Sequence, residues 1–124
     1  MKHDNLRERT KQFALRIIRL VEKLPKGKAA DVIGRQLLRS GTSVAANYRA
    51  ACRAKSAADF ISKMGTVEEE TDESLFWMEL LIDAKLVSDG SLKELTVEAE
   101  EILKIVVSSI KTAKDTLRNA EKKA

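Results

Sequence analysis

The chain has 124 residues, of which 44% are hydrophobic and 34% charged, and its formal net charge is +4. This length holds one domain with one core and excludes two. High contents of both hydrophobic and charged residues are typical of amphipathic helices and exclude a disordered chain. Only 4% of the residues are aromatic and the β-branched residues do not alternate, which argues against a sheet.

The cysteine count and the apolar runs bear on where the protein works. One cysteine excludes an internal disulfide and fits a reducing compartment. The first residues, MKHDNLRERTKQF, carry charges without a following apolar block, unlike a secretory signal. No apolar run approaches the roughly 20 residues that span a bilayer. The sequence therefore predicts a soluble, cytoplasmic all-α domain with no membrane partner.

Apolar residues spaced by three, four and seven predict a first helix over residues 5–24. Pro25 and Gly27 end it, because proline cannot continue the hydrogen-bond ladder and glycine supplies turn geometry. The same periodicity predicts a second helix over residues 29–54.

The second helix contains a stretch of poor helix propensity, RSGTS at residues 39–43. One interpretation is a close helix crossing, or a bend in which Thr42 or Ser43 bonds back to a carbonyl one turn earlier. The other is an exposed kink that presents Arg39, Ser40 and Thr42 to a ligand. Mid-helix irregularities usually have packing causes, which favours the first interpretation.

A third helix is predicted over residues 57–87. Ser56 with Asp59 predicts its N-terminal cap, since a serine hydroxyl can accept from the backbone N–H three residues later. The Ser-Asp-Gly sequence at residues 88–90 ends it.

A fourth helix is predicted over residues 92–121, opened by a capping box of Ser91 and Glu94, with the last residues, 121–124, frayed. Loops of a few residues force consecutive helices antiparallel. The predicted fold is therefore all-α, an antiparallel up-down-up-down four-helix bundle that occupies residues 1–124 as a single domain.

Charge is segregated along the chain. Residues 1–63 carry 15 Lys or Arg against 5 Asp or Glu, and residues 64–124 carry 8 against 14. In the predicted bundle the first two helices make a basic side and the last two an acidic side. A basic side can attract polyanions such as RNA by counterion release, or it can meet the acidic side of another copy in a contact that closes into a ring.

The acidic run EEETDE at residues 68–73 suggests a metal site as one interpretation, because some helical bundles hold di-iron centres with carboxylates that point inward. Those centres also need Glu-x-x-His pairs, and the one histidine, His3, stands near the N-terminus. Folding the third helix back about Lys55 puts Arg39 level with the acidic run, which gives the carboxylates basic neighbours. The sequence predicts no metal and no other cofactor.

Three other side chains have both a structural and a chemical interpretation. Cys52 lies near the apolar stripe without a histidine partner, so it is predicted to be a small core residue rather than a nucleophile. Tyr48 and Trp77 are predicted to be core anchors rather than base-stacking platforms. No set of acid, base and nucleophile converges, so no catalytic residue is assigned and the protein is not expected to be an enzyme.

Specific polar residues interrupt the apolar periodicity of the two middle helices, where a generic bundle would carry arbitrary Lys and Glu. Asn47 and Glu73 lie next to apolar stripe positions, where an unpaired polar group costs roughly 1 to 3 kcal/mol. They are therefore expected to be at least partly buried and hydrogen-bonded. The predicted structural polar core comprises Ser43, Asn47, Asp59, Glu69, Glu73 and Trp77.

These residues carry a resemblance to the four-helix-bundle family encoded in intervening sequences of bacterial large-subunit rRNA genes. The resemblance covers about residues 6–117 and is strongest in the two middle helices. Ala50 departs from the pattern, since relatives often carry Glu there. The matching elements are LRSGTSV at 38–44, ANYR at 46–49, Ser56 with Asp59-Phe60, the acidic residues at 69–73, and Trp77 with ELL at 79–81.

The resemblance implies an antiparallel four-helix bundle that assembles into a homopentamer, with a function that is largely unassigned. The position of the genes in rRNA operons implies association with RNA. A related branch, the accessory variability determinant of diversity-generating retroelements, forms a basic pentameric barrel that contacts a reverse transcriptase and nucleic acid, which is a fold-level analogy.

Two functions are compatible with these observations. The first is a non-enzymatic, oligomeric protein that associates with RNA or other nucleic acid through a basic face of the first two helices, where basic side chains contact phosphates without reading sequence. The predicted phosphate contacts are Arg7, Arg9, Arg16, Arg19, Arg39, Arg49, Arg53 and Lys55.

The alternative is an oligomeric protein-interaction scaffold. In it, basic residues of one copy face acidic residues of a neighbour, which leaves little free positive surface. Salt would then weaken assembly, and RNA would not bind at physiological ionic strength.

Overall fold

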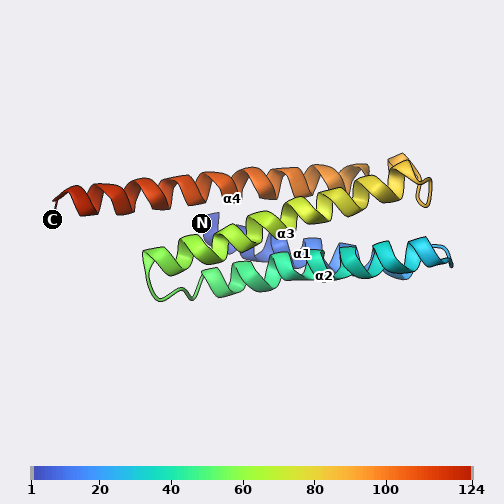
Figure 1. Ribbon diagram of the computed structural model, residues 1–124, viewed down its shortest axis with the longest axis horizontal. Helices are drawn as coiled ribbons and strands as arrows, with labels where there is room; N and C mark the ends of the chain where they lie inside the picture. Colours follow the sequence, from blue (N-terminus) through green and yellow to red (C-terminus); the bar gives the residue numbers. More distant parts are fainter. Residues whose placement is uncertain (1, 124) are drawn as a thin grey trace.

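The computed structural model describes residues 2–123, without the side chains of residues 2–4 and 89. Over that part of the chain the secondary structure consists of four α-helices. Consecutive helices run antiparallel and lie side by side (Figure 1), as expected for the predicted all-α up-down-up-down bundle, which is confirmed. The helices are α1 (Lys2–Glu22), α2 (Lys28–Ala51), α3 (Ala57–Asp83) and α4 (Asp89–Lys123).

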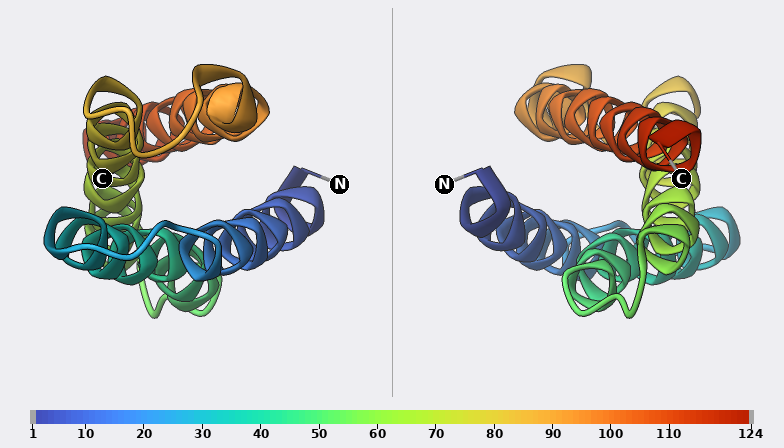
Figure 2. Two further views of the ribbon diagram at one scale, coloured as in Figure 1. Left: turned by 90° about the vertical axis from the view of Figure 1, so that its right-hand side faces the viewer. Right: turned by 90° about the vertical axis from the view of Figure 1, so that its left-hand side faces the viewer.

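The bundle is open along one seam. Figure 2 shows that, viewed along the helices, α3 stands between α2 and α4, while α1 lies beyond α2 and curves back toward α4. The α1–α4 contact is much less extensive than the other three helix contacts. The ends of α4 are also unequal, because its C-terminal part extends beyond the other three helices (Figure 1).

The core consists of the predicted apolar stripes, which meet inside this arrangement. Phe13, Ile17 and Leu37 have no exposed surface, and Tyr48 is 1% exposed. Burying side chains of this size stabilises the fold by roughly 1.5–3 kcal/mol each. The other fully or nearly fully buried core side chains are Leu6, Val44, Ala51, Met64, Val67, Met78, Leu81, Leu92, Leu95, Ala99, Ile102, Val106 and Ile110.

The predicted cap of α3 is confirmed. Ser56 takes extended backbone geometry and its side-chain oxygen accepts from the backbone N–H of Asp59 at 3.0 Å. The Asp59 carboxylate accepts in turn from the backbone N–H of Lys55 at 3.1 Å. Two N–H groups at the start of α3 therefore have partners, as in a capping box.

The boundary between α3 and α4 differs from the prediction. α3 ends at Asp83 rather than residue 87, because Lys85 takes a positive φ of 60°. The backbone N–H of Lys85 bonds to the Ile82 carbonyl at 2.9 Å and that of Leu86 to the Leu81 carbonyl at 3.0 Å. This is a Schellman motif with lysine in the place where glycine is usual, so no glycine marked it in the sequence.

The start and end of α4 also lie outside the predicted bounds. The helix begins at Asp89, so the predicted cap at Ser91 is wrong, and the Ser91 hydroxyl donates to the Ser88 carbonyl at 2.8 Å. At the other end the helix continues through Lys123, so the fraying expected from Glu121 is not seen over the described residues. Nor is any helix in the described part of the chain long and apolar enough to cross a membrane.

The irregular RSGTS stretch lies inside an unbroken α2, so the exposed-kink interpretation is wrong. Gly41 is buried, and a Cβ added to it would lie 2.8 Å from Cγ1 of Ile17 on α1. Ser40 is fully buried as well. Thr42 bonds back to the Leu38 carbonyl at 2.7 Å, as the packing interpretation expected. The stretch therefore lets α1 and α2 approach closely.

We expect Gly41→Ala to lower the free energy of unfolding. Overpacking a well-packed core costs roughly 1–3 kcal/mol, which outweighs the ~1 kcal/mol that alanine gains over glycine in a helix. The contact involves Cβ of Ile17 at 3.1 Å as well as its branches, so a rotation of the Ile17 side chain does not relieve it. Urea denaturation of the variant would measure the change.

Gly65→Ala is the matched control, since Gly65 lies inside α3 with nothing within 4 Å of an added Cβ. It should raise the stability by up to ~1 kcal/mol. Equal effects of the two substitutions would contradict the close approach at Gly41.

Candidate nucleic-acid interface

A groove of about 470 Å³ runs between α1 and α2 on the surface of the bundle. Small side chains on α2 leave room for it, namely Ala45 and Ala46. Its rim carries three cations, Arg7 and Lys11 on α1 and Arg49 on α2, and no acidic residue lines it. The remaining lining residues are Thr10, Thr42 and Tyr48.

The three cations of this groove, called here the α1–α2 groove, are not neutralised by the chain itself. All three residues are exposed, and none forms an ion pair within the part of the chain that the structure describes. Lys11 was not among the predicted contacts. It lies four residues after Arg7, one helix turn away, and this spacing is the signal that places it on the same face.

Arg9, by contrast, is committed to α4. Its guanidinium donates to both carboxylate oxygens of Glu98, at 2.6 and 3.1 Å, and lies 3.9 Å from Glu101. The hydrogen bond to Glu98 keeps the pKa of Arg9 above its ordinary value, although partial burial acts the other way. A bidentate arginine–carboxylate pair fixes geometry as well as charge, so Arg9 bridges the otherwise sparse α1–α4 seam.

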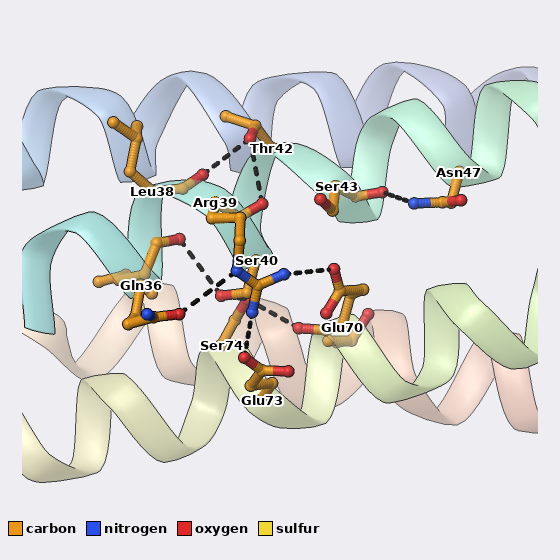
Figure 3. A network of polar contacts seen from close by, with 12 residues as sticks. Gln36, Leu38, Arg39, Ser40, Thr42, Ser43, Asn47, Glu70, Glu73 and Ser74 are labelled. Carbon is orange, nitrogen blue, oxygen red and sulfur yellow. Dashed lines mark hydrogen bonds and ion pairs between the residues drawn. The ribbon is translucent and has the colours of Figure 1, made fainter.

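Arg39 is committed to α3. Figure 3 shows its guanidinium between the carboxylates of Glu70 and Glu73, and the Arg39–Glu70 distance is 2.9 Å. Gln36 also accepts from Arg39 Nε at 3.3 Å. The predicted level of Arg39 beside the acidic run of α3 is therefore correct. Because Glu70 and Glu73 neutralise Arg39, its guanidinium is less available to bind a phosphate.

The other predicted contacts divide in the same way. Arg16 lies 4.0 Å from Glu94, the limit of an ion pair. Arg19, Arg53 and Lys55 are exposed, and their side chains form no ion pair over the described residues. Arg53 and Lys55 stand in the turn after α2, close in sequence to Arg49, whereas Arg19 lies toward the opposite end of α1.

Five of the six residues of the predicted polar core are half-buried rather than central, namely Ser43, Asn47, Asp59, Glu73 and Trp77. Asn47 donates to the Ser43 carbonyl at 2.9 Å. Glu73 accepts from Arg39, and the indole N–H of Trp77 lies 3.4 Å from the same carboxylate oxygen. Both Asn47 and Glu73 are thus partly buried and hydrogen-bonded. Asp59, also half-buried, accepts from Lys63 at 2.6 Å.

The inclusion of Glu69 in the polar core is wrong. Its side chain is exposed and has no hydrogen bond or ion pair in the described part of the chain. Glu70 and Glu73 face α2, and Glu69 lies about 100° round the helix from Glu70, which points it to solvent. Cys52 is also exposed rather than a core residue, because α2 ends at Ala51 and Cys52 is its C-cap.

The fully buried polar groups are hydroxyls that sequence reasoning missed. Ser74 Oγ lies 2.9 Å from Ser40 Oγ and 2.9 Å from the Glu70 carbonyl, so the two serines join α3 to α2 (Figure 3). Thr10 and Thr71 bond to carbonyls of their own helices. Their core-facing positions in the helices could have indicated them. A serine or threonine hydroxyl at such a position can donate to a backbone carbonyl of the preceding turn, so it can be buried without another partner.

The acidic residues do not form a metal site over the described residues, where no group of three or more His, Cys, Asp or Glu side chains could hold an ion. The side chain of His3 lies outside the described residues.

The comparisons with known proteins decide the family. The family of 23S rRNA-intervening sequence proteins matches residues 3–108. The chain belongs to this family. A crystal structure at 1.70 Å of a protein with unknown function from the S23 ribosomal protein family of Bacteroides thetaiotaomicron is similar, with a TM-score of 0.84 and 36% identity over 90% of this chain and 99% of that chain. No curated protein matches.

The resemblance seen in the sequence is thereby confirmed. Neither the family description nor that of the solved relative states a biochemical activity. The function of this intervening-sequence protein therefore has to be argued from its own surface.

We expect Glu73→Ala to destabilise the intervening-sequence protein more than Glu68→Ala. Glu73 accepts from Arg39 and Trp77, whereas Glu68 has no partner within the described residues. Since the pair is partly exposed, the loss should be roughly 0.5–1 kcal/mol, against less than about 0.5 for Glu68. Thermal denaturation would measure both, and equal shifts would contradict a stabilising role for the pair.

A second prediction concerns Asp59, whose pKa is held below its ordinary value by the hydrogen bond from Lys63 and then by the backbone N–H of Lys55. A lowered pKa means that the folded state binds fewer protons than the unfolded one. The stabilisation is present above the ordinary pKa of 3.8 and is lost as the pH falls through the lowered value.

Asp59→Asn should therefore reduce the free energy of unfolding by a constant amount from neutral pH to about pH 5, and the difference should shrink below about pH 4. Urea denaturation over a pH series would measure it. Asp72→Asn is the control, because Asp72 is exposed and unpaired over the described residues, and its effect should vary less with pH. A difference for Asp59 that stays constant down to low pH would refute the assignment.

Proposed function

We propose that this intervening-sequence protein is a non-enzymatic, oligomeric protein that associates with RNA or other nucleic acid through the α1–α2 groove. The observation that carries the proposal is the groove itself, with Arg7, Lys11 and Arg49 on its rim and no acidic lining. Unpaired cations bind phosphates favourably because they release the counterions that surround the nucleic acid. A cation that is already paired with a carboxylate neutralises a phosphate less completely and contributes less to the binding free energy.

The pairing pattern narrows the predicted contacts. Arg9 and Arg39 are held by carboxylates of α4 and α3, so their role is structural. Arg53 and Lys55 follow Arg49 around the end of α2, where they extend the free positive charge. The proposed phosphate contacts are therefore Arg7, Lys11, Arg49, Arg53 and Lys55.

The family description supports RNA as the nucleic acid, since its members are named for intervening sequences of 23S rRNA. Groove chemistry alone does not distinguish RNA from DNA, because phosphate contacts carry no base information. A ribosomal role would be a further step, and the name S23 ribosomal protein family belongs to the solved relative.

A second candidate, the oligomeric scaffold, is favoured by an exposed stripe on α3. Its members recur at spacings of three and four, and the half-exposed Phe76 lies in the middle of acidic residues. Such a stripe fits the basic surface of another copy, with the homopentamer of the family resemblance as the expected assembly. The stripe consists of Glu69, Asp72, Phe76, Glu79 and Asp83.

The test measures binding of the purified, nucleic-acid-stripped protein to structured RNA across a salt series, with its mass in solution determined at each salt concentration. The triple variant R7Q/K11Q/R49Q should lower the salt slope by about 3 and weaken binding at least tenfold near 0.15 M salt, because each lost phosphate contact removes about one unit of slope.

Arg9→Gln is the matched control on the same helix. It removes a cation that is already paired, so RNA affinity should change less than in the triple variant, while the melting temperature falls. A stable oligomer that binds no RNA would overturn the proposal and favour the scaffold. Equal losses of affinity in the control and the triple variant would place the contact outside the groove.

A further inference from the structure

The sign of the charge changes along α4. Residues 89–101 carry 5 Asp or Glu against 1 Lys, whereas residues 102–123 carry 6 Lys or Arg against 2 Asp or Glu. The C-terminal half of α4 therefore does not belong to the acidic side that the order of charges along the chain predicts.

The two halves of α4 differ in how their charges are used. The acidic half faces α1, where Glu98 and Glu101 hold Arg9 and Glu94 approaches Arg16. The basic half has one ion pair within the described residues, a 3.4 Å contact of Arg118 with Asp115 on the same helix, and Arg118 remains 62% exposed. Its lysines have no carboxylate partner there.

The basic side chains share one face of the helix. At 100° per residue they fall within a sector of about 80°, and from first to last they cover about 27 Å of helix. The sector lies away from the core-facing residues Ile102, Val106 and Ile110, which are buried. This set, called here the α4 stripe, consists of Lys104, Lys111, Lys114, Arg118 and Lys122.

The C-terminal part of the stripe projects beyond the rest of the fold (Figure 1). Ile110 is the last buried residue of α4, and none of residues 111–123 is buried. Thr112 and Ala113 still line a pocket with Leu6, Tyr48 and Phe60, and the helix extends past the other three beyond them. This segment also lies beyond residues 3–108, the part matched by the family. The segment therefore contributes little to the core of the monomer.

The stripe and the α1–α2 groove lie at the same end of the bundle. Ile17 with Gly41 and Ser40 with Ser74 mark the middle level. The groove residues of α1 and α2 lie on the side of this level at which α2 ends, and residues 104–122 of α4 extend toward the same side (Figure 1).

We propose that the α4 stripe is a second nucleic-acid contact, which binds the phosphate backbone of double-stranded segments. The proposal rests on the proposed function and adds a site and a ligand class to it. Double-stranded DNA carries one charge per about 1.7 Å when both strands are counted, so a 27 Å length of it has about 16 phosphates, part of which face the stripe.

The absence of aromatic platforms among the described residues at this end favours duplex over single strands. Tyr48 and Phe13 are buried and Phe60 is half-buried, while the surface pair of Phe76 and Trp77, with ring centroids 5.1 Å apart, lies on α3 beyond the middle level marked by Ser74. Proteins that bind single strands without sequence preference stack bases on exposed aromatics. The α4 stripe consists of cations without exposed aromatic rings, so it can contact the phosphates of a duplex whose bases stay paired.

The test compares the full-length protein with the variant K111Q/K114Q/R118Q/K122Q by anisotropy titration of a duplex RNA of ~20 base pairs, from about 50 to 200 mM salt. The variant should lower the salt slope by about 4 and weaken binding at least tenfold at the highest salt. Helical content and melting temperature should stay near wild type, because none of the four residues is buried. Single-stranded RNA of equal length should bind more weakly than duplex.

The charge-matched control is K23Q/K26Q/K28Q/R35Q, four exposed and unpaired cations at the opposite end of the described chain. It should leave the affinity within about threefold, since only local cations contact the ligand. Equal losses in both quadruple variants would overturn the inference in favour of a net-charge effect.

The remaining outcomes separate this inference from the proposed function. A wild-type affinity that falls in R7Q/K11Q/R49Q but not in the α4 variant would overturn the stripe and leave the groove standing. Loss in the α4 variant alone would support the stripe and count against the groove. A wild-type protein that binds neither duplex nor single-stranded RNA would overturn both, whereas one that binds single-stranded RNA but no duplex would overturn only the stripe.

Discussion

The close approach of α1 to α2 at Gly41 is the constraint on which the arrangement of this protein depends. There is no room for a Cβ between Gly41 and Ile17, so the Ile17 side chain packs directly against the backbone of α2 at that level. One turn further along α2 the side chains are again small, at Ala45 and Ala46, and the space beside them is the α1–α2 groove. The same stretch of α2 thus sets the helix packing and positions the groove cations.

Electrostatic pairing decides which of the many basic residues remain available. Arginines that face a neighbouring helix are held by its carboxylates, as Arg9 is by Glu98 and Arg39 by Glu70. Partly desolvated pairs of this kind stabilise the helix contacts and reduce the free positive charge there. Unpaired cations remain in the groove and on the α4 stripe, toward one end of the bundle, and also at the opposite end, where Lys23, Lys26, Lys28 and Arg35 are exposed. The net charge of +4 hides this division.

Much of the fold could be predicted because it follows from local rules. The period of the apolar residues gave four helices, and the Ser56 cap was readable from a serine followed three residues later by Asp59. The end of α3 was not readable, because Lys85 takes a backbone conformation that sequence rules assign to glycine. For the candidate site, the sequence predicted contacts at Arg7 and Arg49, which line the groove, but not at Lys11. It also predicted Arg9 and Arg39 as phosphate contacts, although carboxylates of neighbouring helices neutralise both.

The sequence by itself determined the helices, the apolar faces, the family and the excess of basic residues in the first half of the chain, because each depends on residue identity and spacing along one helix. Only the tertiary structure decided which charges face each other, because helix register and rotation bring residues from different helices together. It placed the acidic half of α4 against α1 and left the C-terminal end of the basic half projecting beyond the bundle. The segregation by chain halves therefore does not hold in α4, whose C-terminal half is basic.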